Sequence, residues 1–239
     1  MAGTLRALVA EFLGTFAWVC LGAGAVCADS LSGGRLGQTG IGLCQGLAVA
    51  AAFALFGRRA QGLFNPAVTA ALVLFKRLTP PQALLCLLSQ LLGAALAGMF
   101  LAGAFSRAEI SSTEPFLGAC LPSVGFRAAT LIEAVMTFFL AVAAGRALAA
   151  RPEDHAAWSL AGGAIAAAAT LTAFPLTGAA FNPARAFGPA VVTGQWSLHY
   201  VYWVGPAAGA VLGVAATRFL FSAQREEKEK AVHQASQLS

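Results

Sequence analysis

The sequence is poor in charged residues. Of its 239 residues, 15 are Lys or Arg and 10 are Asp or Glu, together 10% of the chain, whereas soluble domains are about 25% charged. Hydrophobic residues make up 58% of the chain, and the mean hydropathy is +0.73. Such a chain has too little polar surface to cover a water-soluble globule and too much apolar content to be disordered. The composition therefore predicts a membrane protein with several spans.

Residues that form metal-binding or reactive clusters are also scarce. The three histidines lie far apart, and the five cysteines show neither a CxxC motif nor metal-ligand spacing. We therefore expect buried structural thiols and no metal or other cofactor. The net charge is +5, but the basic residues are spread along the chain rather than gathered in a patch. We expect no nucleic-acid partner, because a basic balance is also usual in membrane proteins.

Long apolar runs, in contrast, are abundant. Six segments reach the roughly 20 residues that a bilayer-spanning helix needs, and they are about 5–28, 36–57, 81–105, 126–149, 156–174 and 198–222. Transmembrane β-strands alternate apolar and polar residues, so these runs exclude a β-barrel and predict an all-α membrane protein. Two further apolar stretches, about 65–75 and 182–193, are too short to cross, and each begins with Asn-Pro-Ala.

The basic residues predict how the chain is oriented in the membrane. With both termini in the cytoplasm, the inside would carry Arg6, Arg58, Arg59, Lys76, Arg77, Arg146, Arg151, Arg218, Arg225, Lys228 and Lys230, and the outside would carry Arg35, Arg107 and Arg127. This bias predicts a multi-pass protein with both termini in the cytoplasm and residues 223–239 as a polar cytoplasmic tail. We expect a plasma membrane or bacterial inner membrane rather than an organelle membrane.

The chain contains an internal repeat. Three landmarks recur in the same order at offsets of about 122, 117 and 116 residues: Glu11-x-x-x-Thr-Phe16 with Glu133-x-x-x-Thr-Phe138, Phe64-Asn-Pro-Ala67 with Phe181-Asn-Pro-Ala184, and Gln90-x-x-Gly93-Ala with Pro206-x-x-Gly209-Ala. The two halves, about 5–105 and 126–222, hold three spans each. Because three is odd, the second half must be inverted relative to the first, with a pseudo-two-fold axis in the membrane plane.

The repeated motifs Asn65-Pro66-Ala67 and Asn182-Pro183-Ala184 each predict the start of a short helix. Asn is a favoured N-cap, and Pro is favoured at the first helical position. Ordinary loops also contain such helix starts, but two copies at symmetric positions, each opening a non-spanning apolar segment, indicate re-entrant half-helices. Entering from opposite faces, they would meet N-terminus to N-terminus near the midplane. Irregular backbone at that depth is buried in protein or lines water, so a polar pathway is predicted there.

With these motifs, the chain resembles an aquaporin (major intrinsic protein) over roughly residues 5–222. The runs Asn65-Pro-Ala-Val-Thr69 and Asn182-Pro-Ala-Arg-Ala-Phe-Gly-Pro-Ala190 carry the resemblance, together with the repeated Glu motif. It implies six tilted transmembrane helices, two re-entrant half-helices that form a seventh pseudo-span, and one channel domain over residues 1–222. It also implies a homotetramer in the lipid bilayer, in which each protomer has its own pore.

The half-helices suggest how such a pore would exclude ions. Each helix N-terminus carries about half a positive charge, and the two dipoles disfavour cations. We expect Asn65 and Asn182 to cap their helices through the side-chain carbonyl, which leaves each NH₂ group free to face the pore. Glu11 and Glu133 are costly in lipid, and we expect them to support the re-entrant backbone. No nucleophile–base pair indicates an enzyme.

The resemblance also implies a selectivity filter. Arg185 matches the arginine that forms one wall of the family's narrowest constriction, and counting from the two motifs adds Gln45, Thr170 and Ala179. Water-selective members carry Phe and His at the first two of these positions, so we expect a wider and more polar constriction here. Glycerol facilitators, however, place an Asp after the arginine, whereas Ala186 follows it here.

We therefore expect a passive channel for water and small neutral solutes (hydrogen peroxide, ammonia, urea or glycerol) that excludes protons and ions. Residues 186–190 and the Tyr202-Trp203 pair are similar to water-channel and tonoplast-type members. Leu63 stands where relatives usually have a His in the cytoplasmic vestibule, which removes a pH-sensitive group. Three alternatives stay open: a glycerol or small-solute facilitator, a secondary transporter, which also uses inverted repeats and broken helices, and an adhesive protein that conducts poorly.

Overall fold

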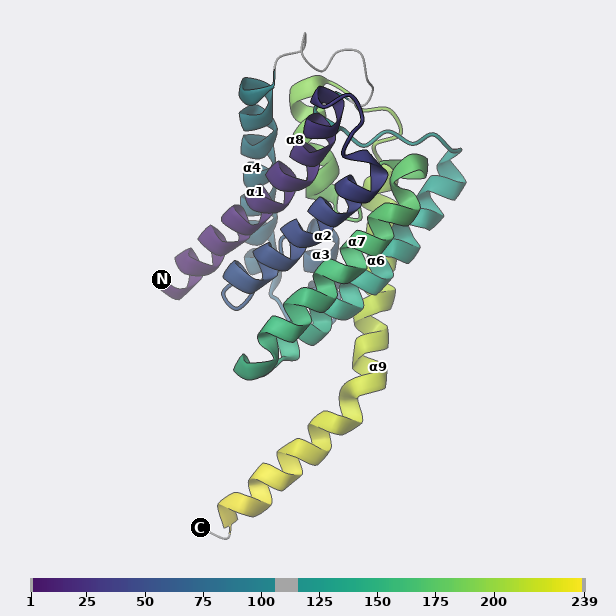
Figure 1. The fold of residues 1–239 in the computed structure, drawn as a ribbon. Helices are drawn as coiled ribbons and strands as arrows, with labels where there is room; N and C mark the ends of the chain where they lie inside the picture. Colours follow the sequence, from purple (N-terminus) through teal and green to yellow (C-terminus); the bar gives the residue numbers. More distant parts are fainter. Residues whose placement is uncertain (1, 106–115, 238–239) are drawn as a thin grey trace.

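The computed structural model describes residues 2–105 and 116–237, and it describes side chains for residues 3–105 and 116–221. Every regular element in these ranges is a helix (Figure 1). The long helices are α1 (Ala2–Leu31), α2 (Gly37–Phe56), α4 (Pro80–Ala104), α6 (Phe126–Ala149), α7 (His155–Thr177) and α9 (Val201–Gln237). The short ones are α3 (Pro66–Leu74) and α8 (Pro183–Thr193), with single turns η1 (Phe116–Gly118) and η2 (Pro152–Asp154).

The six long helices confirm the six predicted spans. By length and hydropathy, each can cross a membrane, and the spans run Gly3–Leu31, Gly37–Phe56, Pro80–Ala104, Phe126–Ala149, Pro152–Thr177 and Val201–Phe221. Helix α9 continues to Gln237, beyond the predicted end of its span at residue 222. Of the predicted topology residues, Arg107 lies outside the described residues, as do the side chains of Arg225, Lys228 and Lys230. The protein is thus an all-α, multi-pass integral membrane protein.

The helices pack as the inverted repeat requires. Helix α1 packs on α4 as α6 packs on α9, and α1 packs on α2 as α6 packs on α7. The half-helices exchange partners: α8 packs on α4 of the first half, and α3 packs on α9 of the second. Helices α2 and α7 pack on each other, and α1 begins and α9 ends on the same side of the bundle (Figure 1). Each half therefore holds the other half's re-entrant helix.

Glycines bring the two halves into direct backbone contact. A Cβ atom added to Gly46 of α2 would lie 2.6 Å from the carbonyl oxygen of Gly163, and one added to Gly163 would lie 2.6 Å from the carbonyl oxygen of Gly46. The two glycines are 117 residues apart, the same offset as the two Asn-Pro-Ala motifs. The pseudo-two-fold axis therefore passes close to this contact, where a larger residue would push α2 and α7 apart.

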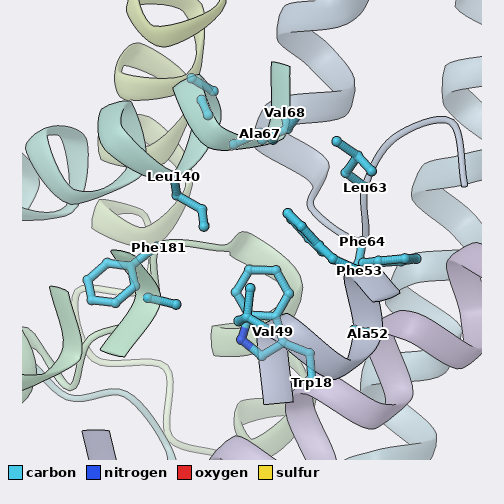
Figure 2. Packing of buried hydrophobic residues seen from close by; sticks show 14 of the residues in the cluster. Trp18, Val49, Ala52, Phe53, Leu63, Phe64, Ala67, Val68, Leu140 and Phe181 are labelled. Carbon is cyan, nitrogen blue, oxygen red and sulfur yellow. The ribbon is translucent and has the colours of Figure 1, made fainter. Parts of the chain in front are cut away.

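Apolar side chains surround the place where the half-helices meet. Trp18, Phe53, Phe64, Leu140 and Phe181 belong to one buried cluster built from both halves, shown in Figure 2. Leucines exposed on the spans face outward, as expected for a protein in lipid. Of the five cysteines, all of which are free thiols, Cys27, Cys86 and Cys120 are buried, whereas Cys20 and Cys44 are half-buried.

Candidate functional site

The two half-helices meet end to end inside the bundle. Asn65 and Asn182 have extended backbones, with φ of −142° and −156°, and each side-chain oxygen accepts a hydrogen bond from the backbone N–H two residues later at 2.9 Å. Pro66 and Pro183 occupy the first helical positions, where no N–H is required. The caps that the sequence predicts are therefore present, because Asn and Pro satisfy the local backbone at both helix starts.

The asparagine amides also join the two halves. Asn65 Nδ2 donates to the carbonyl oxygen of Phe181 at 2.9 Å, and Asn182 Nδ2 donates to the carbonyl oxygen of Phe64 at 2.8 Å. Each NH₂ group, which the sequence predicts to face the pore, therefore uses one of its two N–H bonds across the pseudo-two-fold axis. One N–H on each amide remains for another acceptor.

The two buried glutamates hold the segments that lead into the half-helices. The carboxylate of Glu11 accepts bonds from the backbone N–H groups of residues 61–64, at 2.5 to 3.1 Å, and from Gln90 Nε2 at 2.8 Å. The carboxylate of Glu133 accepts bonds from the N–H groups of Ala180 (3.2 Å) and Phe181 (2.7 Å) and from Thr177 Oγ1 (2.7 Å). Each glutamate therefore supports the half-helix of its own half, as the sequence predicts.

These carboxylates stabilise backbone that is otherwise unfavourable. Four residues have left-handed backbone conformations with φ between 50° and 61°, which residues other than glycine rarely adopt: Leu63, Phe64, Ala179 and Phe181. Such residues cost about 1–3 kcal/mol each and persist where their surroundings hold them. Leu63, Phe64 and Phe181 are held by N–H bonds to the glutamate carboxylates, worth about 1.5–3 kcal/mol each. The N–H of Ala179 donates instead to Thr177 Oγ1 at 3.1 Å. Leu63, where the family resemblance implied a vestibule His, is buried and donates its N–H to Glu11.

Arg185 lies in the first turn of α8 and is almost fully buried, with 2% of its surface exposed. Its Nη1 donates to the carbonyl oxygen of Gly118 at 2.8 Å and lies 3.4 Å from Cys120 Sγ. Among the described residues, its Nε has no hydrogen-bond partner. A Cβ added to Gly178 would lie 2.9 Å from Cys120 Cα, which places neighbouring Ala179 on the same segment. Arg185 and Gly178, the residue before Ala179, therefore both contact Cys120.

Gln45 on α2 and Thr170 on α7 lie beside a close contact between these two helices. Gly42, one turn before Gln45 on α2, would place a Cβ 2.8 Å from the side chain of Leu171, which follows Thr170 on α7. Gln45 extends toward α1, where a Cβ on Gly22 would overlap its Oε1 atom. Thr170 Oγ1 donates to a backbone oxygen of its own helix at 2.8 Å. Within the described part of the chain, neither polar atom of the Gln45 side chain has a partner.

Helix α1 contacts both Gln45 and the segment that holds Arg185. Gly22 contacts Gln45, and the next residue, Ala23, contacts Gly118, whose carbonyl oxygen accepts the bond from Arg185. Each of the four predicted filter residues is only 1 or 2% exposed, so the predicted widening of the constriction does not appear as exposed surface. The long Gln45 side chain fills part of the space that a smaller residue would leave open.

Sequence reasoning missed several residues that support this region. Gly118 and Cys120 hold Arg185, but their segment carries no motif. Tyr202 donates its hydroxyl to the carbonyl oxygen of Thr177 at 2.5 Å, and Thr177 in turn donates to Glu133. Gln90 could have been found, because it opens one of the repeated landmarks; it is fully buried between Glu11 and Thr69, at 2.8 and 2.9 Å.

His199 lies just before the span of α9 and anchors it. Its Nδ1 accepts a hydrogen bond from Trp203 Nε1 at 3.1 Å, and its ring lies 4.7 Å from the Trp196 ring and 5.8 Å from the Tyr202 ring, between centroids. Burial lowers the pKa of this imidazole below its ordinary value of 6.5. The neutral ring therefore fits this aromatic cluster better than the charged one.

Comparisons with known proteins agree with this geometry. The family model described as major intrinsic protein matches residues 1–216. The chain is 38% identical to "Aquaporin TIP4-4" from Zea mays over 232 residues (93% of this chain, 89% of the relative), and 40% identical to "Lens fiber major intrinsic protein" from Gallus gallus over 211 residues (87% and 78%). It is also 34% identical to "Aquaporin-4" from Mus musculus over 230 residues (94% and 70%).

A solved structure shows the same fold. The aquaglyceroporin from Plasmodium falciparum superposes with a TM-score of 0.75 at 24% identity, covering 90% of this chain and 95% of that one. At this identity the likeness concerns the fold, and the family follows from the relatives and the family model. The capped half-helices, the inverted repeat and these matches lead to one conclusion: the chain belongs to the major intrinsic protein family of passive membrane channels.

Proposed function

We propose that this chain conducts water and small neutral solutes through a pore between its two halves and excludes ions and protons. The observation that carries the proposal is the junction of α3 and α8, where two helix N-termini and two asparagine amides converge. The half-helix dipoles make this point unfavourable for cations. The remaining N–H of each amide would bind a passing water oxygen and turn that water, which interrupts a chain of hydrogen bonds along which protons could move.

We propose that Gln45, Thr170, Ala179 and Arg185 form the selectivity filter. Arg185 supplies a fixed positive charge and hydrogen-bond donors, and Gln45 offers both a donor and an acceptor without another partner among the described residues. A filter with an amide and a hydroxyl, in place of two rings, would accept small polar solutes as well as water. The competing function is that of a glycerol or small-solute facilitator. It predicts a solute permeability that is high relative to the water permeability.

A secondary transporter is less well supported by the contacts. Coupling to an ion gradient requires ionisable groups that change state along the pathway. The two buried carboxylates, Glu11 and Glu133, instead hold backbone N–H groups in place. They act as fixed supports, and a protonation cycle would release the strained segments that they hold.

Light scattering from reconstituted vesicles after rapid mixing tests the proposal. We expect water flux above that of empty vesicles, with a low activation energy and no saturation, and measurable flux of urea, glycerol or hydrogen peroxide. A flux that requires an ion gradient, or the absence of water flux from correctly folded protein, would contradict the channel function.

Introducing aromatic rings at positions 45 and 170, as in water-selective members of the family, tests whether these residues form the filter. The double variant Gln45→Phe with Thr170→His should cut solute flux by about tenfold or more while water flux changes less, because added bulk narrows the constriction. Thr172→His is the matched control: Thr172 is exposed and bonds to its own helix at 2.9 Å, as Thr170 does at 2.8 Å. Unchanged solute flux in the double variant would show that these residues do not form the filter.

We further propose that the protein is a homotetramer with both termini in the cytoplasm, residing in a plasma membrane or bacterial inner membrane. The family resemblance supports the tetramer, and the distribution of basic residues supports the orientation. Because the relatives include plant TIP proteins, an organelle membrane is the competing location. Native mass spectrometry of the purified protein and imaging of a fluorescent fusion in its own cells test these two statements.

A further inference from the structure

Trp18 on α1 is a buried tryptophan whose indole N–H is not paired by the helices packed around it. The side chain is 0% exposed, and within the described residues its Nε1–H has no hydrogen-bond partner. A buried donor left without an acceptor costs about 1–3 kcal/mol, and buried indole N–H groups usually find a partner. An acceptor that the protein itself does not provide would resolve this cost.

The neighbours of Trp18 along α1 locate it. Gly14, one turn earlier, lies so close to the Phe64 ring that a Cβ there would overlap the ring, and Gly22, one turn later, lies equally close to Gln45 Oε1. Residues four apart share one face of a helix and are about 6 Å apart along its axis. Trp18 therefore lies on the same face of α1, midway between the residue that precedes the first Asn-Pro-Ala motif and the candidate filter.

Helix α2 runs past the same positions of the bundle as α1, in the opposite order along the chain. Gln45 lies at the level of Gly22, and Phe53, two turns later, has its ring centroid 5.8 Å from that of Phe64. Val49 lies between them, is fully buried and belongs to the same cluster as Trp18. In Figure 2, the Trp18 nitrogen lies on the side of the indole that faces Leu140 and Phe181. Trp18 therefore lies between the junction of the half-helices and the candidate filter.

The repeat shows that this donor is specific to one half. Trp18 follows Glu11 by seven residues, and Leu140 follows Glu133 by seven. Leu140 is 2% exposed and has no polar side-chain atom. The pseudo-symmetric position, on the opposite side of the junction, is therefore apolar, and Val49, at the level of Trp18, is apolar too. A permeating molecule would meet one N–H donor in an otherwise apolar stretch of wall.

We propose that the Trp18 indole N–H faces the conduction path and donates a hydrogen bond to the oxygen of the permeating molecule between filter and junction. This inference rests on the proposed function, because it assigns the acceptor to a permeating water, or to a neutral solute with an acceptor oxygen. In a narrow apolar stretch, a water molecule loses hydrogen bonds that it made in bulk. One fixed donor there lowers the barrier to passage and favours permeants that can accept.

Hydrogen exchange of the indole N–H tests where Trp18 faces. The protein would be labelled with ¹⁵N-tryptophan, reconstituted and transferred to D₂O, and the Trp18 signal assigned by its loss in Trp18→Phe. We expect rapid exchange, because only water within the path can reach this fully buried group. Two tryptophans provide references in the same sample: Trp196, which is 45% exposed, should exchange fast, and Trp203, which donates to His199, should exchange slowly. Exchange of Trp18 as slow as that of Trp203 would overturn the proposal.

An isosteric replacement tests the donor itself. Incorporating 3-benzothienylalanine at position 18 replaces the N–H by sulfur and keeps the shape of the ring. We expect water permeability per folded protein to fall about two- to tenfold, with a higher activation energy, because one hydrogen bond in the path is lost. The same replacement at Trp196 is the control and should leave permeability unchanged.

The outcomes separate this inference from the proposed function. Unchanged permeability with benzothienylalanine at position 18 would overturn the donor role, although wild-type protein still conducts water. Wild-type protein that conducts no water would instead overturn the proposed function, and exchange at Trp18 would then report only whether water reaches the indole. Trp18→Phe serves as a second variant if incorporation is poor, since it also removes the N–H.

Discussion

Two buried carboxylates determine the backbone at the centre of this channel. Glu11 and Glu133 are both 0% exposed, and each accepts hydrogen bonds from the segment before its half-helix. The segments include left-handed residues such as Phe64 and Phe181. Without a fixed acceptor, their N–H groups would be unpaired inside the bundle, at a cost of about 1–3 kcal/mol each. The hydrogen bonds from the surrounding backbone therefore offset the free-energy cost of burying a carboxylate in the membrane.

Neutralising one of these glutamates should destabilise the protein. In Glu133→Gln, the amide NH₂ would face groups that are themselves donors, Phe181 N–H and Thr177 Oγ1. We expect a loss of about 2 kcal/mol or more in stability, seen as a lower thermal transition in detergent, and reduced water flux. Glu153→Gln is the control. Glu153 is 59% exposed and pairs with Arg151 at 3.2 Å, and exposed pairs contribute little. Equal transitions for both variants would contradict the supporting role.

His199 should make stability depend on pH. Burial lowers the pKa of this imidazole in the folded protein, so the unfolded chain binds a proton at higher pH than the folded one. The free energy of unfolding should therefore fall as pH drops below about 6.5 and level off below the folded pKa. His199→Gln keeps an acceptor for Trp203 but cannot titrate. Thermal scans between pH 8 and pH 5 should show a shallower decline for this variant; parallel curves would argue against the assignment.

At the scale of the helices, the fold depends on close backbone approach. Helices α2 and α7 touch at Gly46 and Gly163, and α4 and α8 touch at Gly98 and Gly188, where in each case an added Cβ would collide with the facing helix. Such contacts are typical of helix packing in membranes, where lipid provides no hydrophobic drive for association. Since each half-helix packs on the opposite half, these contacts also hold the two helix N-termini in register.

A larger residue at the α2–α7 contact should therefore impair both folding and conduction. In Gly46→Val, the new side chain would meet the backbone of Gly163 and the side chain of Ala167. We expect a destabilisation of about 1–3 kcal/mol, as for other overpacked sites. Gly103→Val is the matched control, because nothing lies within 4 Å of a Cβ there. Thermal stability in detergent and water flux in vesicles are the two measurements. A wild-type transition for Gly46→Val would show that the contact tolerates separation.

At the scale of the whole molecule, the charged side chains that the structure describes lie at or near the ends of the spans, apart from three supported groups inside the bundle. Arg146 lies over the rings of Trp158 (4.7 Å) and Phe221 (4.0 Å), and Arg218 donates to the carbonyl oxygen of Phe75 at 3.2 Å. These contacts tie the ends of several helices together. The interior retains Arg185 and two glutamates, each held by hydrogen bonds.

The proposed orientation predicts which segments are reached from outside the cell. Epitopes at the N-terminus and after residue 239 should be detected only after permeabilisation, because α1 begins and α9 ends on one side of the bundle. An epitope inserted between Gly33 and Gly34, in the turn after α1, should be detected in intact cells. Added Cβ atoms at both glycines meet nothing within 4 Å, so the insertion should leave the fold intact. The reverse labelling pattern would invert the proposed topology.

The sequence by itself determined the six spans, the inverted repeat, the two capped half-helices and the role of Glu11 and Glu133. These features follow from hydropathy, from local capping chemistry and from the cost of an unpaired carboxylate in lipid, all of which act within short stretches of chain or repeat visibly along it. The family and its candidate filter positions also followed from linear motifs.

Only the tertiary structure decided how the halves recognise each other. The bonds from Asn65 to Phe181 and from Asn182 to Phe64 join residues more than a hundred positions apart. Gln45 contacts Gly22 of another helix, and Arg185 donates to Gly118, 67 residues earlier in the chain. No local pattern encodes these pairings. They depend on which polar groups remain unsatisfied once the helices have packed. Trp18, an ordinary apolar residue in the sequence, therefore emerges as a donor without a partner among the described residues.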